Sequence, residues 1–369
     1  MVVNMALNLS PYVIAGLSIL AASVYLLRPQ NSISASKQRP AINQELYNSL
    51  RHGRLASGRE SSHRKVTLPD GRTLGYAIYG TSSPDAPTIF FIHGYGDNRL
   101  TGGFFAAAAE DLGVRLISVD RPGWGLSTTK MGVTVLDFAQ DLRHLAEKLE
   151  VRQYSVMGAS GGGPATLACA YVLPKEQLKG ITMLIASGPW YETTMRHARG
   201  FAWLFWTVMC FSPALLRWTG VRALNSYRDM PMEKYVEVAK RNNNGWLIRL
   251  FARPHAKDLA IFEDGEIFKY SYDLVHENTK RGDDAQGMIE DFMAMTAKDL
   301  GFRVEDIRKD LPVQLWYGKY DQSVSYRVGE DLQRMLGERA TLHVRDETHA
   351  SMLIYSRPVL EKALEDLRK

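Results

Sequence analysis

Residues 153–173 read QYSVMGASGGGPATLACAYVL, and this stretch decides how the rest of the chain is interpreted. An apolar, β-branched run reaches Gly158-Ala159-Ser160-Gly161-Gly162, and an alanine-rich helical pattern follows. The pattern predicts a strand, a tight turn and a helix with Ser160 at the apex, which is the arrangement of a nucleophile elbow. Such a turn needs small neighbours, because the serine backbone is strained and the strand and the helix pack closely.

The glycines of this turn permit two other interpretations. A glycine-rich turn before a helix is also typical of phosphate-binding loops, but neither G-x-x-x-x-G-K-[ST] nor G-x-G-x-x-G fits the spacing. A plain glycine-rich turn stays open when the motif is taken alone. Whether this is a plain glycine-rich turn or a nucleophile elbow therefore depends on whether the chain also supplies the other residues of a catalytic set.

His349 is the candidate base for Ser160, because a serine hydroxyl is too weakly acidic at neutral pH to attack unaided. It lies in HVRDETHASML, after a strand-like run at residues 340–345 and before a short C-terminal helix pattern. Seven other histidines occupy a polar linker, an amphipathic helix, a helical insertion or a strand interior: His52, His63, His144, His197, His255, His276 and His343. The position of His349 in a late strand-to-helix loop favours it.

Asp321 is the candidate acid that would orient the imidazole and stabilise its charged form. It follows a buried-type strand pattern in PVQLWYGKYDQSVS. The loop after the preceding strand, Ser187-Gly188-Pro189, carries no carboxylate, and Asp346 lies too near His349 in sequence to reach its ring easily. Taken alone, Asp321 could be an ordinary solvated turn residue. The chain order Ser160, Asp321, His349 favours the catalytic interpretation.

Two backbone amides are candidates for an oxyanion hole, which needs N–H donors aimed at the developing negative oxygen. Gly161 follows Ser160 directly and lies at the positive end of the predicted helix. The second donor is expected in the loop after the strand of APTIFFIHGYGDN, where we assign the amide of Tyr95. The neighbouring glycines allow a substrate to approach that amide, and His93 is expected to hold the loop by hydrogen bonds.

These motifs together resemble the α/β-hydrolase superfamily, over residues from about 66 to 369. The matching stretches, in sequence order, are HGYG (93–96), DRPGWGLS (120–127), GASGGGP (158–164), the loop from Gly318 to Asp321, and His349. The resemblance implies the α/β-hydrolase fold and a serine hydrolase. Ser160 departs from the aspartate nucleophile of the epoxide hydrolase and haloalkane dehalogenase branches, where DRPGWG is common, so these two chemistries are disfavoured.

Alternating strand and helix patterns up to Ser187 predict an α/β fold with a mostly parallel sheet covered on both faces. We expect the hydrolase core at residues 66–189 and 307–369, with a helical cap at residues 190–306 between its two parts. A helix is expected near residues 101–112. Within the cap, FAWLFWTVMCFSPALLRW (201–218) is either a buried helix over the core or a membrane-facing wall that admits acyl chains.

The first 27 residues, Met1–Leu27, carry no charged side chain, and their apolar run reaches membrane-spanning length. We expect a single-pass membrane anchor here. A cleaved signal peptide, a transit peptide and a buried helix are the alternatives, and the positive n-region typical of a signal peptide is lacking. Residues 28–65 form a basic linker with eight Lys/Arg against two Glu. The positive-inside rule therefore places the catalytic domain in the cytosol.

Charge and cysteine content indicate which partners and cofactors to expect. The 369-residue chain has a formal net charge of +5, and the basic linker supplies this excess. The remaining domain is electrically balanced, so we expect no nucleic-acid partner. Cys169 and Cys210 form neither a disulfide framework nor a metal-binding spacing, and we expect no cofactor and no metal.

The sequence thus predicts a membrane-anchored serine hydrolase that cleaves carboxylic esters of apolar small molecules or lipids through an acyl-enzyme. Three enzymes with the same residues stay open as alternatives: an acyltransferase, a thioesterase and a C–C hydrolase. A non-catalytic hydrolase-fold binding protein is a fourth. The sequence fixes neither the substrate, which depends on how cap side chains are arranged, nor the oligomeric state.

Overall fold

The computed structural model describes residues 51–56, 58–198, 200–243, 255, 257–258, 261, 265–280 and 285–368. The anchor expected at residues 1–27 lies outside these ranges, as does the linker up to residue 50. Among the helices of the described ranges, none is both long and apolar enough to cross a membrane. Residues 51–56 are helical and place Ala56 against the core.

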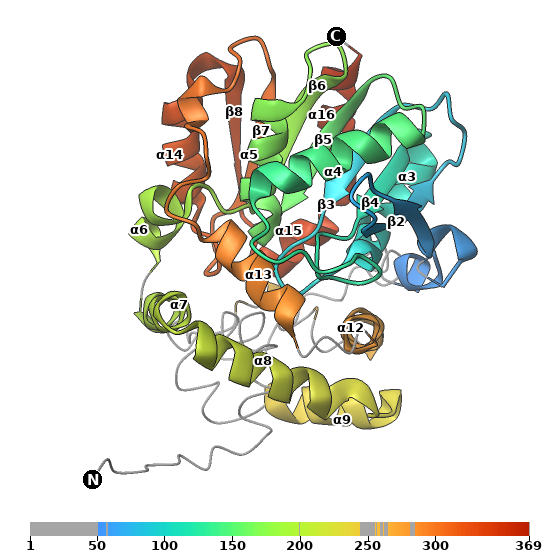
Figure 1. The fold of residues 1–369 in the computed structure, drawn as a ribbon, viewed down its shortest axis with the longest axis vertical. Coiled ribbons are helices and arrows are strands. Elements are labelled where there is room, and N and C mark those ends of the chain that lie inside the picture. The colour runs from blue at the N-terminus through green and yellow to red at the C-terminus, as the bar shows by residue number, and fades with distance from the viewer. Residues whose placement is uncertain are drawn as a thin grey trace, which may run out of the picture.

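An eight-stranded sheet forms the centre of the molecule, in the order β1-β2-β4-β3-β5-β6-β7-β8 (Figure 1). β2 pairs antiparallel with β1 and with β4, and every other pair is parallel. The strands are β1 (Arg64–Thr67), β2 (Thr73–Gly80), β3 (Thr88–Ile92), β4 (Arg115–Val119), β5 (Tyr154–Ala159), β6 (Leu178–Leu184), β7 (Val313–Gly318) and β8 (Ala340–Arg345). The mostly parallel sheet expected from the sequence is confirmed.

Helices cover both faces of the sheet. All residues of β3, β4 and β5 are buried, which explains why these strands read as continuous apolar runs rather than alternating ones. One face carries α4 (Val135–Lys148), α5 (Gly163–Val172) and α14 (Tyr326–Leu336), and the other carries α3 (Ala106–Leu112) and α16 (Ser356–Leu367). The remaining short elements of the core are η2 (Glu60–Ser62), η4 (Ser160–Gly162), η6 (Val304–Asp306), η7 (Gly337–Arg339) and α15 (His349–Ile354).

The helix expected near residues 101–112 is only partly formed. Its first half is a 3₁₀ segment, η3 (Arg99–Phe105), and the α-helix begins at Ala106. The glycine pair at 102–103 disfavours an α-helix, since glycine has the lowest helix propensity after proline. A Cβ on Gly102 would come within 2.6 Å of Ser118 Cβ on β4, so the glycine also permits the segment to lie close to the sheet.

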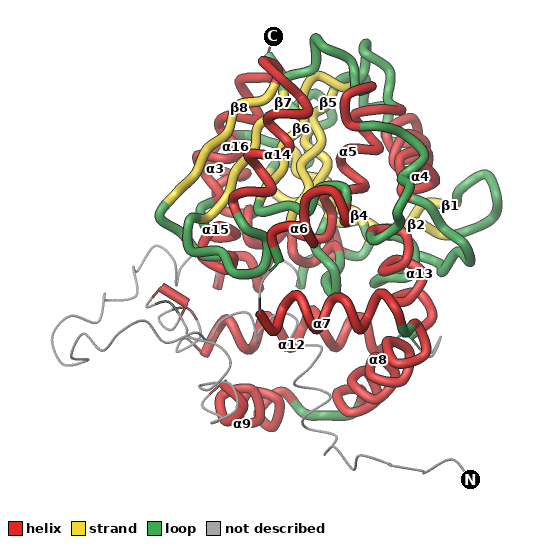
Figure 2. The backbone as a smooth tube through the Cα atoms, turned by 90° about the vertical axis from the view of Figure 1, so that its left-hand side faces the viewer, coloured by secondary structure: helices red, strands yellow, loops and turns green. Residues whose placement is uncertain are grey.

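A layer of helices lies across the end of the sheet at which the parallel strands finish (Figure 1, Figure 2). It begins after β6 and ends before β7, within the cap range expected from the sequence. Its elements are η5 (Trp190–Thr194), α6 (Met195–His197), α7 (Gly200–Phe211), α8 (Pro213–Arg228), α9 (Met232–Asn243), α12 (Gly265–Thr279) and α13 (Gln286–Met295).

A buried ion network joins this cap to the sheet. The Arg99 side chain is fully buried and lies 3.1 Å from Asp120, which directly follows β4, and 2.6 Å from Glu277 on α12. Its Nε also donates to the carbonyl of Ser62 at 2.6 Å. The network is sensitive to substitution, because loss of Arg99 would leave two buried carboxylates without their common cation and loss of either carboxylate would leave the buried guanidinium with a single partner.

We expect Glu277→Gln to lower the free energy of unfolding by about 3 kcal/mol, since the buried Arg99 guanidinium would lose one of its two carboxylates. The matched control is Glu147→Gln, which removes the exposed pair with Arg143 on α4 and should cost less than about 0.5 kcal/mol. Urea unfolding followed by circular dichroism measures both variants. Equal destabilisation of the two would contradict a structural role for the network.

Candidate active site

Ser160 lies at a strained turn between β5 and α5. Its φ is 49°, a left-handed value that is uncommon for residues other than glycine. Neighbouring segments of the chain lie so close to this turn that side chains on the flanking glycines would not fit. A Cβ on Gly158 would collide with the Thr166 hydroxyl, and a Cβ on Gly163 would collide with the Ser187 carbonyl. The small residues of the motif therefore permit the turn that holds the Ser160 side chain at the end of the sheet.

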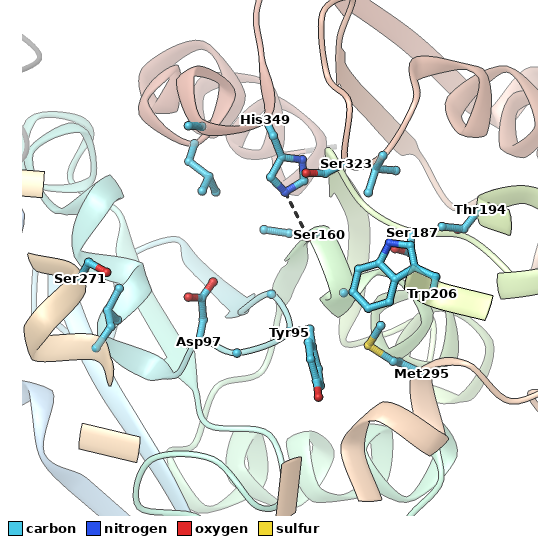
Figure 3. Close-up of a pocket in the computed structure, with 18 of the residues that line it drawn as sticks. Tyr95, Asp97, Ser160, Ser187, Thr194, Trp206, Ser271, Met295, Ser323 and His349 are labelled. Atoms are coloured by element: carbon cyan, nitrogen blue, oxygen red, sulfur yellow. Dashed lines mark hydrogen bonds between the residues drawn. The ribbon is translucent and has the colours of Figure 1, made fainter. Parts of the chain in front are cut away.

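Hydrogen bonds join Ser160 to the two other residues that the sequence singled out. His349 Nε2 lies 3.1 Å from Ser160 Oγ (Figure 3). His349 Nδ1 lies 2.7 Å from Asp321 Oδ2. The Asp321 side chain is fully buried, and its other oxygen accepts hydrogen bonds from the backbone amides of Ser323 and Val324 at 2.6 and 2.9 Å. The carboxylate is thereby fixed on one side by the loop and on the other by the imidazole.

The groups around His349 stabilise the charged form of its imidazole. Burial lowers the pKa of His349, but the attraction of Asp321, with smaller contributions from Asp258 and Asp97, outweighs it and raises the pKa above its ordinary value. Burial raises the pKa of Asp321, and its bonds with His349 and the loop amide oppose that change. An imidazole with Nδ1–H directed at a carboxylate presents Nε2 to the serine as a proton acceptor.

The two amides assigned to the oxyanion hole lie next to each other. A Cβ on Gly161 would be 2.9 Å from the backbone nitrogen of Tyr95. Among the described residues, none accepts a hydrogen bond from the Tyr95 amide, which lies beside the cavity. The loop that carries Tyr95 and the turn that carries Gly161 are thus adjacent, and both residues line the cavity.

His93 holds the loop that carries Tyr95. Its ring is buried, with Nδ1 2.8 Å from the carbonyl of Gly94 and Nε2 accepting from the backbone amide of Arg121 at 3.0 Å. Burial lowers the pKa of His93 well below its ordinary value, so the ring is neutral and can donate to one group and accept from the other.

Two of the residues that the sequence argument set aside, Asp346 and His343, do not join this site. Asp346 is 74% exposed and pairs with Lys319 at 3.5 Å. His343 stacks on Trp316 with ring centroids 4.0 Å apart, and its Nε2 donates to the side-chain oxygen of Gln314. Both therefore have ordinary structural surroundings, as the sequence had suggested for His343.

A cavity of about 280 Å³ opens beside Ser160 and His349, between the core and the cap (Figure 3). Most of its lining side chains are apolar. The cap contributes a wall of aromatic and aliphatic residues: Trp190, Trp206, Met209, Leu216, Ile261, Ile267, Leu274, Met288 and Met295. The segment at 201–218 is thus partly a cavity wall, since Trp206, Met209 and Leu216 line it, and partly a surface, because Phe211 is 81% exposed.

The cap also contacts the loops that carry the base and the acid. Asp258 of the cap accepts a hydrogen bond from the hydroxyl of Thr348, next to His349. The ring of His255 stacks on Tyr320, the neighbour of Asp321, with centroids 4.5 Å apart. Burial raises the pKa of Asp258 to about 7. These contacts make the cap part of the site's support and not only a lid over the cavity.

Two carboxylates near His349 were missed at the level of sequence. Asp258 lies in a helical insertion whose pattern gives no sign of its contact with Thr348. Asp97 follows directly on HGYG, so its place beside the oxyanion loop was open to inference from spacing alone. No cluster of three or more His, Cys, Asp or Glu side chains suited to a metal ion occurs in the part of the chain described.

Comparison with known proteins gives weak matches in sequence over part of the chain. "Uncharacterized hydrolase YcgS" of Bacillus subtilis is 27% identical over 114 residues, which are 31% of this chain and 38% of that protein. "2-hydroxy-6-oxononadienedioate/2-hydroxy-6-oxononatrienedioate hydrolase" of Cupriavidus pinatubonensis is 28% identical over 130 residues, 34% of this chain and 44% of that protein. The matched part thus spans less than half of either relative.

Solved structures match over much more of the chain. A carboxylesterase structure from Nitrososphaera gargenis has a TM-score of 0.57 at 16% identity, covering 83% of this chain and 98% of its own. The enol-lactonase from Burkholderia xenovorans has a TM-score of 0.53 at 16% identity, covering 83% and 100%. At this level of identity the likeness concerns the fold. The model of the alpha/beta hydrolase family matches residues 89–361, most of the sheet and the whole cap, and the chain belongs to that family.

Proposed function

We propose that this hydrolase cleaves carboxylic esters of apolar small molecules or lipids through a covalent acyl-enzyme on Ser160. The observation that carries the proposal is the continuous hydrogen-bonded chain from Asp321 through His349 to Ser160, which ends at a strained turn and opens on an apolar cavity. A serine needs an oriented base to attack, and this geometry supplies one.

The reaction follows from the roles of these groups. Ser160 Oγ attacks the acyl carbon while His349 Nε2 takes its proton, and Asp321 stabilises the imidazolium. The amides of Tyr95 and Gly161 donate to the oxyanion of the tetrahedral intermediate. His349 then gives the proton to the departing alcohol, which leaves the acyl group on Ser160. A water molecule deprotonated by His349 attacks this ester, releases the acid and restores the serine.

The cavity supports an apolar substrate. Its walls are mostly hydrocarbon and aromatic, and contacts among Trp190, Trp206 and Phe292 order the cap side, with Trp206 and Phe292 stacked at 6.0 Å. Transfer of an apolar chain from water to such walls is favourable by roughly 25 cal/mol per Å² buried. Acyl transfer to another acceptor, or cleavage of a thioester or a C–C bond, would use the same residues, and product analysis with and without competing alcohols distinguishes these reactions.

We further propose that residues 1–27 anchor the enzyme in a membrane with the catalytic domain on the cytosolic side. The support is the absence of charge in this segment and the basic linker that follows it. The cap also exposes three large aromatic side chains, Trp203 and Phe211 on α7 and Trp218 on α8, and exposed aromatic side chains suit the interface of a bilayer.

Ser160→Ala should reduce kcat for 4-nitrophenyl butyrate by about 10⁴-fold or more and abolish labelling by a fluorophosphonate probe, because the nucleophile is lost. The matched control is Ser83→Ala, in an exposed loop before β3, which should retain both. Steady-state kinetics and in-gel fluorescence measure the two effects. Labelling retained in Ser160→Ala would place the nucleophile elsewhere.

Asp321→Asn should lower kcat by about 10⁴-fold, because an amide no longer favours the tautomer in which Nε2 accepts a proton. Asp321 also raises the pKa of His349, so the acidic limb of the residual pH–rate profile should move to lower pH. The control is Asp346→Asn, which alters an exposed carboxylate and should leave kcat and the profile as in the wild type. The reverse result would assign the acid to Asp346.

Leu17→Arg with Leu20→Arg should move the full-length protein from the carbonate-washed membrane fraction into the supernatant, because each arginine at the centre of a span costs about 2.5–3.5 kcal/mol. Immunoblotting of fractions measures the shift, and protease treatment of sealed vesicles reports the side on which the catalytic domain lies. Wild-type protein found only in the supernatant would refute the anchor.

A further inference from the structure

Asp97 is a second acidic group of the site, on the loop between β3 and η3. Its side chain lines the cavity, and its carboxylate is directed into it, on the opposite side of Ser160 from Trp206 (Figure 3). The position of a hypothetical Cβ on Gly94 would be 3.2 Å from Asp97 Oδ2 and 3.6 Å from Ser160 Oγ. The carboxylate and the serine hydroxyl therefore border the same small space.

Among the described residues, none forms a hydrogen bond or an ion pair with the carboxylate of Asp97. The other acids nearby are all engaged: Asp321 with His349, Asp258 with Thr348, and Asp291 with Trp124 and Arg121. A carboxylate in apolar surroundings is unfavourable unless it is paired. Burial accordingly raises the pKa of Asp97 to about 7, although Arg121 and His349 oppose the change.

Each of the nearby cationic side chains already pairs with another carboxylate. Arg121 lies 3.1 Å from Asp291 and donates to the carbonyl of Gly161, while His349 is held by Asp321. Beside them, Asp97 adds an acidic group to a cavity that is otherwise mostly apolar. A ligand that brings one positive charge to this side of the cavity would therefore complete the charge balance.

We propose that Asp97 binds a protonated amine of the substrate, placed one or two carbons from the ester group that Ser160 attacks. This inference rests on the proposed ester hydrolysis and specifies its substrate class: an apolar ester with a single basic nitrogen. Asp97 Oδ2 and Ser160 Oγ are close enough for this assignment, because both lie within 3.6 Å of the position that a Cβ on Gly94 would occupy. An ammonium two carbons from an acyl carbon bonded to Oγ can therefore reach the Asp97 carboxylate across the space beside Gly94. A charge-assisted hydrogen bond is about twice as strong as one from a neutral hydroxyl, which favours the amine as occupant.

The competing interpretation is that Asp97 acts only through the pKa of His349, to which it contributes. The two interpretations differ in what a substitution changes. A binding residue selects between substrates, so its loss alters the ratio of two rates. A residue that acts only on the base affects every ester by a similar factor.

The test compares esters that differ only by an ammonium nitrogen in place of a CH group. One pair varies the acyl side: 4-nitrophenyl 3-(dimethylamino)propanoate and 4-nitrophenyl 4-methylpentanoate. The other varies the alcohol side: 2-(dimethylamino)ethyl butyrate and 3-methylbutyl butyrate. After subtraction of spontaneous hydrolysis, we expect the wild type to show a kcat/KM ratio of about tenfold or more in favour of the amine in at least one pair. Asp97→Asn should reduce that ratio about tenfold.

Asp85→Asn is the matched control, because it makes the same chemical change in an exposed turn before β3 and should keep the wild-type ratio. If Asp97→Asn does not fold, Asp97→Ser takes its place. A wild-type ratio near one in both pairs overturns the inference, as does a preference that persists without Asp97. An equal loss of kcat/KM on all four esters would instead show that Asp97 acts only through the pKa of His349. Absence of turnover of all four esters by the wild type overturns the ester function as well, whereas turnover without preference overturns the amine site alone.

Discussion

The left-handed backbone of Ser160 is the constraint on which the rest of the site depends. A strand and a helix can meet at such an angle only when the residues around the apex are small, and the Thr166 hydroxyl and the Ser187 carbonyl occupy the space that larger side chains would need. Strain of this kind costs of order 1–3 kcal/mol and persists only where the surroundings hold it. Here β5 and α5, both within the main core, hold it.

The other groups of the site are supplied by loops at the same edge of the sheet. Asp321 follows β7 and His349 follows β8, so adjacent parallel strands deliver the acid and the base side by side. The cap then contacts both loops, through Asp258 and His255, and is joined to the sheet by the buried pair of Arg99 and Glu277. A change in the position of the cap would therefore be transmitted to the residues that hold the imidazole.

Much of this arrangement was open to prediction from sequence, because each motif follows an apolar strand and the strand order brings the motifs together. The parallel sheet and the meeting of Ser160, Asp321 and His349 followed from that logic. The packing of the cap helices did not, since helical periodicity says which face of a helix is apolar but not what it packs against. The contact of Asp258 with Thr348 links residues 90 positions apart, and no local pattern marks it. Likewise, no sequence pattern shows that the Asp97 carboxylate is without a partner among the described residues, because this depends on which groups the fold places beside it and on how those groups are paired.

In the proposed reaction, Ser160 carries the acyl group during turnover. The most direct measurement is mass spectrometry of the enzyme quenched with acid during hydrolysis of 4-nitrophenyl butyrate, followed by peptide mapping. We expect a butyryl adduct on the peptide that contains Ser160, present early in turnover and absent after the substrate is exhausted. A butyryl group on any other residue, with Ser160 unmodified while 4-nitrophenol is still being released, would contradict it.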